Sequence, residues 1–141
     1  MNTTTSTDAV LLAAGLIFLL ALVLGVWKYR QMVTSENHLA HPYVDIAHRA
    51  ALMYSFATMM LAVFVQLSSF STAVNMVAAF VPIFFFVSAI VSYIVHGALR
   101  DTDNQLARPM PGTHTFFWLL VIGEIGGFSV LLVGFAQAQI F

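Results

Sequence analysis

The residues best suited to chemistry lie between positions 38 and 48, where the chain reads HLAHPYVDIAH. This stretch contains three of the five histidines and one of the six acidic residues, namely His38, His41, Asp45 and His48. Neutral imidazole binds zinc, copper and iron, and a nearby carboxylate serves as a further ligand or as a hydrogen-bond acceptor. The stretch therefore predicts a cofactor or metal site, with His48, His41 and Asp45 as the candidate metal ligands.

The same histidines also have a simpler interpretation. Their spacing matches no standard zinc module, and amphipathic imidazole rings are stable in a loop at a membrane surface. For His38, His41 and His114 the loop interpretation is favoured. His48 and His96 lie at the ends of apolar segments, where ionisable groups are costly and usually functional. We expect these two histidines to bind the cofactor.

Composition identifies the elements that must position these residues. The chain has 141 residues, of which 60% are hydrophobic and 8% charged, and its mean hydropathy is +0.91, values typical of a membrane protein. Four apolar segments approach or exceed the roughly 20 residues that span a bilayer, at about 9–29, 43–67, 73–98 and 115–137. Short polar connections between them predict a single all-α domain, 1–141, folded as a four-helix up-and-down bundle.

The basic residues predict the orientation of these segments. All five fall on one side of the predicted bundle, at Lys28, Arg30, Arg49, Arg100 and Arg108. By the positive-inside rule that side is cytoplasmic, so both termini face the other side of an inner, multi-pass membrane protein. The chain has no cysteine, which excludes disulfides and thiolate metal sites. The absence of a basic run argues against nucleic acid as a partner.

Two further signals lie within the predicted helices. Glu124 falls about 15 Å of helical rise from the cytoplasmic end of the last helix, where a charged carboxyl is costly. It is either a proton donor or a hydrogen-bonded structural residue, and Tyr54 is its candidate catalytic partner. His48 and His96 would lie at similar depth on adjacent helices, although His96 could instead cap its own helix.

Small residues in the last segment indicate close packing. Gly123 and Gly127 have the G-x-x-x-G spacing, which lets another helix or a flat cofactor approach closely. Packing between helices, within the chain or between subunits, is the favoured interpretation. Residues 101–104 (DTDN) form an acidic stretch just outside the membrane. A helix C-terminal turn or a partner-docking loop is favoured there over a cation site.

Four short helices and the pair Ala47-His48 at the entrance of the second helix resemble the membrane isomerases of the styrene oxide isomerase and hydroxylaminobenzene mutase group. The resemblance implies that His48 is an axial ligand of haem b near the subunit boundaries of an oligomer. That family has an asparagine six residues after the histidine, followed by glycine, whereas this chain has Tyr54-Ser55. The resemblance covers the architecture and about twenty residues after Ala47.

Two function hypotheses follow. The first is a membrane enzyme that binds haem b, or a transition metal held by histidine and carboxylate, and isomerises a small apolar or aromatic substrate. In it His48 holds the iron, which acts as a Lewis acid, and Tyr54 or Glu124 moves protons. The alternative is a non-enzymatic subunit or assembly factor of a larger membrane complex, with no cofactor. In either case we expect the lipid bilayer and a homo-oligomer or membrane complex as partners.

Overall fold

The computed structural model of the protein describes residues 4–107, 109 and 111–141, and within them it contains four α-helices and no β-strand. These are α1 (Thr5–Thr34), α2 (Pro42–Leu67), α3 (Thr72–Leu99) and α4 (Thr113–Gln139). Each helix is long and apolar enough to cross a membrane, because 26 to 30 residues rise about 39 to 45 Å. The predicted all-α class and the four predicted segments are confirmed, as expected of a multi-pass membrane protein.

The ends of the helices follow capping residues rather than hydropathy. α1 begins before the predicted position 9 because the Thr4 side chain accepts a 3.3 Å hydrogen bond from the backbone N–H of Thr7, the usual way to satisfy a helix N-terminus. It continues beyond the predicted position 29 to Thr34, so the polar residues that follow the apolar run also belong to the helix. α2 begins at Pro42, one residue before the predicted position 43, because the missing proline N–H is not needed at the start of a helix.

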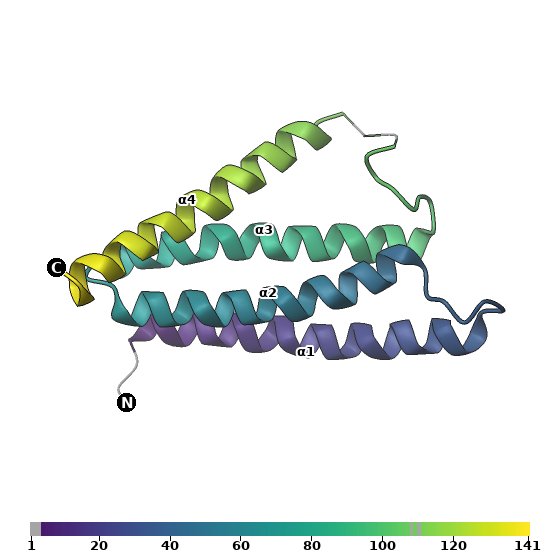
Figure 1. Ribbon diagram of the computed structural model, residues 1–141, viewed down its shortest axis with the longest axis horizontal. Helices are drawn as coiled ribbons and strands as arrows, with labels where there is room; N and C mark the ends of the chain where they lie inside the picture. Colours follow the sequence, from purple (N-terminus) through teal and green to yellow (C-terminus); the bar gives the residue numbers. More distant parts are fainter. Residues whose placement is uncertain (1–3, 108, 110) are drawn as a thin grey trace.

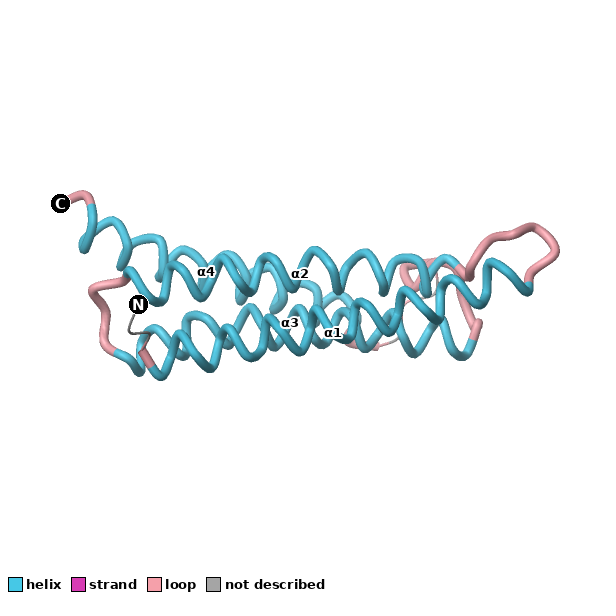
Figure 2. The backbone as a smooth tube through the Cα atoms, turned by 90° about the horizontal axis from the view of Figure 1, so that it is seen from below, coloured by secondary structure: helices cyan, strands magenta, loops and turns pink. Residues whose placement is uncertain are grey.

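The four helices form two layers and run alternately up and down. Both termini lie at the end of the molecule where α2 turns into α3, and the longer connections lie at the opposite end, which we call the loop end (Figure 1). Seen along the perpendicular direction, α1 and α3 form one layer and α2 and α4 the other (Figure 2). The described residues of α1 and α4 make no contact, so the bundle is open on that side.

Small residues set the close packing of α1 against α2. Ala21, Ala47 and Ala51 are fully buried, and side chains of this size let two helix backbones approach closely. Large apolar side chains point outward instead, and Leu12 and Met53 are 65% and 72% exposed. An outer face of this kind is stable against acyl chains and unfavourable in water.

Gly123 and Gly127 of α4 pack against α3, which confirms the predicted helix packing and places it within the chain. A Cβ atom on Gly127 would lie 2.5 Å from the carbonyl oxygen of Ala78 and 2.7 Å from the ring of Pro82. Pro82 has no N–H to donate to the Ala78 carbonyl four residues earlier, so α4 approaches α3 where its hydrogen-bond ladder is interrupted. A Cβ on Gly123 would meet the ring of Phe85.

Beyond these glycines α4 diverges from α3 toward its own N-terminus (Figure 1). Among the described residues of α4 only Leu131 and Gly134 are buried, and both lie in its C-terminal half. The N-terminal half therefore leaves a space beside α3 at the loop end of the molecule.

Candidate functional site

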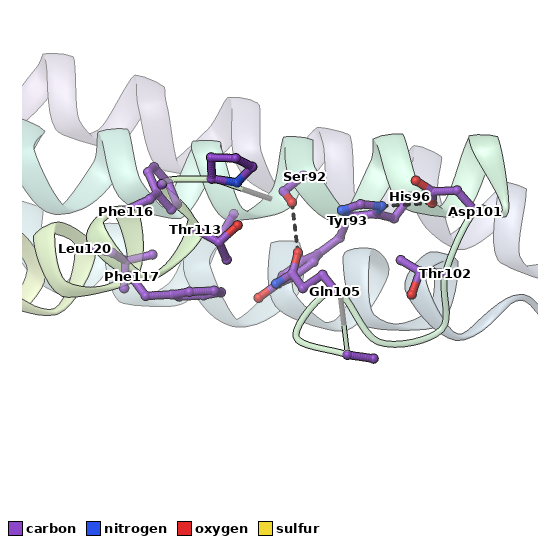
Figure 3. Close-up of a pocket in the computed structure, with 14 residues that line it drawn as sticks. Ser92, Tyr93, His96, Asp101, Thr102, Gln105, Thr113, Phe116, Phe117 and Leu120 are labelled. Atoms are coloured by element: carbon purple, nitrogen blue, oxygen red, sulfur yellow. Dashed lines mark hydrogen bonds and ion pairs between the residues drawn. The ribbon is translucent and has the colours of Figure 1, made fainter. Parts of the chain in front are cut away.

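A cavity of about 640 Å³ lies between α3, α4 and the loop that joins them (Figure 3). Its volume is within the roughly 300–1,000 Å³ of sites for small molecules. One part of its wall is apolar and largely aromatic, with Ala89, Phe116, Phe117 and Leu120. The other part is polar and is formed by Ser92, Tyr93, His96, Asp101, Thr102 and Gln105. The cavity suits a small molecule with an aromatic body and one polar end.

A buried tyrosine holds the loop over this cavity. The hydroxyl of Tyr43, a residue of α2 that is 4% exposed, accepts a 2.6 Å hydrogen bond from the backbone N–H of Gln105. The side-chain oxygen of Gln105 in turn accepts a 3.2 Å hydrogen bond from the hydroxyl of Ser92 in α3 (Figure 3). These two bonds fix the Gln105 side chain in the cavity wall.

His96 and Asp101 form the ionisable pair of the cavity. Nδ1 of His96 lies 2.9 Å from Oδ1 of Asp101, and this hydrogen bond holds the pKa of the Asp101 carboxyl below its usual value. A carboxylate only accepts hydrogen bonds, so Nδ1 carries the proton and Nε2 of a neutral His96 is free to act as a base. The ring of Tyr43 lies 5.1 Å from the imidazole, centre to centre, and restricts its orientation.

His41 lies beside this group but is engaged structurally. It caps α2, with Nδ1 accepting a 3.3 Å hydrogen bond from the backbone N–H of Tyr43. Its Nε2 lies 3.2 Å from Oδ1 of Asp103. The two carboxylates of the acidic stretch, Asp101 and Asp103, therefore both contact histidines of the same chain.

Asp45 is occupied by two basic side chains. Its Oδ1 lies 2.6 Å from Nζ of Lys28 in α1, and its Oδ2 lies 2.8 Å from a guanidinium nitrogen of Arg49. The described part of the chain contains no group of three histidine, aspartate or glutamate residues that could hold a metal ion. The structure thus does not bring His41, Asp45 and His48 together as the predicted metal site.

His48 faces α1 rather than the cavity. Its Nδ1 lies 2.9 Å from the backbone carbonyl oxygen of Ala21, and its ring lies against Gly25, where a Cβ would come within 2.9 Å of Cε1. A carbonyl only accepts, so Nδ1 carries the proton and Nε2 bears the lone pair. Histidine ligands of metals typically donate their other N–H to such an acceptor.

The two predicted cofactor histidines are consequently not brought together. His48 donates to α1, whereas His96 lies between Tyr43 and Asp101 at the α3–α4 cavity. His48 is absent from the walls of that cavity.

The two predicted catalytic residues lie inside the helix bundle. The ring of Tyr54 stacks on Phe86 of α3 with centroids 4.3 Å apart. Glu124 is close enough to interact electrostatically with the phenols of Tyr54 and Tyr93, and its Oε1 is buried without a hydrogen-bond partner among the described residues. The structure thus brings Tyr54 and Glu124 to the same region, outside the residues that line the cavity.

Sequence reasoning missed Tyr43 and Gln105. Tyr43 resembles an interfacial aromatic anchor at the start of a helix, and its partner lies 62 residues away. The helical spacing does place Ser92 and, less closely, Tyr93 on the face of His96, but it contains no signal for Tyr43 or Gln105.

Comparison with known proteins gives no relative: no family model, curated protein or solved structure matches this chain.

Proposed function

We propose that this chain is a membrane enzyme that binds a small, largely apolar aromatic molecule in the α3–α4 cavity and isomerises it by proton transfer at His96. The observation that supports this proposal is the position of the His96–Asp101 pair in the polar wall of a cavity whose apolar wall includes Phe116, Phe117 and Leu120. The apolar wall would hold the aromatic body, and the polar wall would hold the reacting group.

An isomerisation matches what the site contains. Nε2 of His96 removes a proton from the terminal carbon of an aryl epoxide while the benzylic C–O bond breaks, and it returns the proton to the benzylic carbon of the resulting enolate to give the aldehyde, so atoms and electrons balance without a co-reactant. The Asp101 carboxylate stabilises the imidazolium that forms between the two steps, as a positioned general acid–base pair requires. Gln105 and Ser92 offer hydrogen bonds to a polar substituent.

The test uses small aryl epoxides, whose aldehyde products have the same mass as the substrate. Purified protein in detergent should convert them, and His96→Ala should lower the rate by about 10²–10⁴-fold, the usual contribution of a general acid–base group. His114→Ala is the matched control, because His114 is exposed and does not line the cavity. Equal activity of the two variants would refute a role for His96.

A second candidate, haem b held by His48, is favoured by a different observation. The Nδ1–H of His48 is fixed by the Ala21 carbonyl, and Nε2 is the nitrogen that remains for a metal. Bound haem would supply iron as a Lewis acid, and His48, which would hold it, faces α1 and does not line the α3–α4 cavity. Tyr54 and Glu124 are the candidate proton carriers within the bundle.

Absorption spectra of the purified protein, oxidised and then reduced with dithionite, separate the two candidates. A Soret band that shifts on reduction and is lost in His48→Ala but not in His38→Ala supports haem ligation. A colourless preparation with isomerase activity supports catalysis in the α3–α4 cavity without haem. Inactive, colourless protein favours the third possibility, a subunit of a larger membrane complex, for which the exposed N-terminal half of α4 offers a contact surface.

For the orientation we propose that the loop end is cytoplasmic in an inner membrane. Lys28, Arg30, Arg49 and Arg100 lie at that end, and Arg108 lies outside the described residues. Because the native chain has no cysteine, single cysteines report the side directly. An impermeant thiol reagent applied from outside intact cells should label Ala138→Cys, at the end with both termini, and leave Glu36→Cys unlabelled.

A further inference from the structure

A second cavity lies at the loop end on the opposite side of the molecule from α4. Its volume is about 700 Å³, and it is formed along one face of α1 with a single residue from the end of α3. The lining residues are Val23, Val26, Trp27, Arg30, Gln31, Thr34 and Arg100. A smaller polar cavity of about 430 Å³ adjoins it and shares Gln31, Thr34 and Arg100. Neither cavity includes a residue of the candidate active site around His96.

The two arginines of this groove face no acidic partner in the described part of the chain. Lys28 and Arg49, the other described basic residues, both pair with Asp45. Arg30 and Arg100 form no ion pair there, and no aspartate or glutamate lines either cavity. The groove therefore concentrates two positive charges, and guanidinium groups bind phosphate oxygens through paired hydrogen bonds.

The rest of the groove is apolar and continues along a membrane-spanning helix. Val23 and Val26 are 58% and 61% exposed and lie one to two turns from Arg30 on α1, toward the middle of the span. Trp27 stands between the valines and the arginine, the position that tryptophan prefers at the boundary of a bilayer. A ligand that satisfies both parts has an anionic head and an apolar tail.

We propose that this groove binds an acidic phospholipid, with the headgroup phosphate between Arg30 and Arg100 and an acyl chain along Val23 and Val26. Basic pockets between membrane-spanning helices bind anionic headgroups in this way. The bilayer supplies such a ligand directly, and the charges at the groove complement it.

Fluorescence of Trp27 provides the test, in a Trp118→Phe background that leaves one tryptophan in the chain. The protein, in neutral detergent micelles, is titrated with phosphatidylglycerol or phosphatidylcholine that carry identical brominated acyl chains, which quench nearby tryptophan. Phosphatidylglycerol should quench Trp27 at a lower mole fraction than phosphatidylcholine does. The two mole fractions should differ by about fivefold for each arginine that contributes about 1 kcal/mol.

Three variants make the test specific. Arg30→Gln and Arg100→Gly should each reduce the preference for phosphatidylglycerol. Arg100 has φ 52°, a conformation that glycine adopts without strain, so Arg100→Gly removes the charge while suiting the fold. Arg49→Gln removes the same charge from the same end of the molecule but outside the groove, and it should retain the preference.

Each other outcome overturns the proposal. Equal quenching by the two lipids shows that the groove does not select an anionic head. Equal loss in Arg49→Gln shows a general effect of surface charge. Displacement of the lipid by inorganic phosphate at equal concentration shows that the site takes free phosphate instead of a lipid.

Discussion

Gly127 of α4 lies against the ring of Pro82 in α3, at the point where the proline interrupts the hydrogen bonds of its helix. The two helices diverge from here toward the loop end, where the α3–α4 cavity lies between them. Because Gly127 has no side chain, α4 can approach α3 at this contact, and the cavity lies where the two helices have separated.

Substitution at this contact should destabilise the protein and alter the cavity. The Cβ of Gly127→Ala would overlap the Ala78 carbonyl and the Pro82 ring, so we expect a loss of about 1–3 kcal/mol, the usual cost of overpacking. Thermal unfolding in detergent measures it. Gly126→Ala is the matched control, since a Cβ there meets nothing within 4 Å. If Gly126→Ala is as destabilising as Gly127→Ala, the α3–α4 contact is not the cause.

The bond between Tyr43 and Gln105 predicts how the loop over the cavity is held. Tyr43→Phe removes the acceptor of the Gln105 N–H at a cost of about 0.5–1.5 kcal/mol, which should fall mainly on the loop. Amide hydrogen exchange of Gln105 and its neighbours should therefore accelerate by roughly 2- to 12-fold. Exchange within α1 should stay unchanged, and Tyr29→Phe, at a tyrosine 66% exposed, should have no effect. Unchanged exchange at Gln105 would contradict this role of Tyr43.

The four helices could be predicted because each apolar run is long enough to span a bilayer by itself. Their ends could not, since the Thr4 cap of α1 depends on a side-chain hydrogen bond that hydropathy does not register. The divergence of α4 (Figure 1) was likewise beyond the sequence, because the apolar pattern of one helix does not report the angle at which it crosses another.

The candidate site was predicted only in part for a related reason. A helical period gives the face on which His48 lies but not the neighbour that covers that face, and here the neighbour is α1. His96 was identified by its type and depth. Its partner Asp101 is near in sequence, but Tyr43 reaches the same site from another helix, and no local pattern reports such a contact.

The His96–Asp101 pair predicts a specific dependence of stability on pH. The hydrogen bond from His96 lowers the pKa of Asp101 in the folded protein from 3.8. A lowered folded pKa means that the pair stabilises the protein fully above the unfolded pKa and stops doing so as the pH falls through the folded one. Asp101→Asn should therefore be less stable than the native protein at neutral pH. The difference should begin to shrink as the pH falls below about 4 and should be lost once the pH is below the folded pKa of Asp101.

Thermal unfolding measured across this pH range tests the assignment. Glu36→Gln is the control, because Glu36 is exposed and forms no ion pair within the described part of the chain. Its stability should follow that of the native protein throughout. A difference for Asp101→Asn that persists unchanged into acid would mean that the carboxylate charge is not the source of the stabilisation.

The hydrogen bond to the Ala21 carbonyl predicts which ring nitrogen of His48 carries the proton, and Gly25 leaves room for the ring to make that bond. In the native protein the Ala21 carbonyl selects the tautomer protonated at Nδ1. A Cβ on Gly25 would lie 2.9 Å from Cε1 of the imidazole and displace the ring, so Gly25→Ala should lose this bond and about 0.5–1.5 kcal/mol of stability. Nitrogen NMR of labelled histidine should show the Nδ1–H form of His48 in the native protein and its loss in Gly25→Ala. Gly15→Ala, on the same helix and with nothing within 4 Å, should keep the native signal. If Gly25→Ala also keeps it, the glycine does not position His48, and the case for His48 as a ready axial ligand is weakened accordingly.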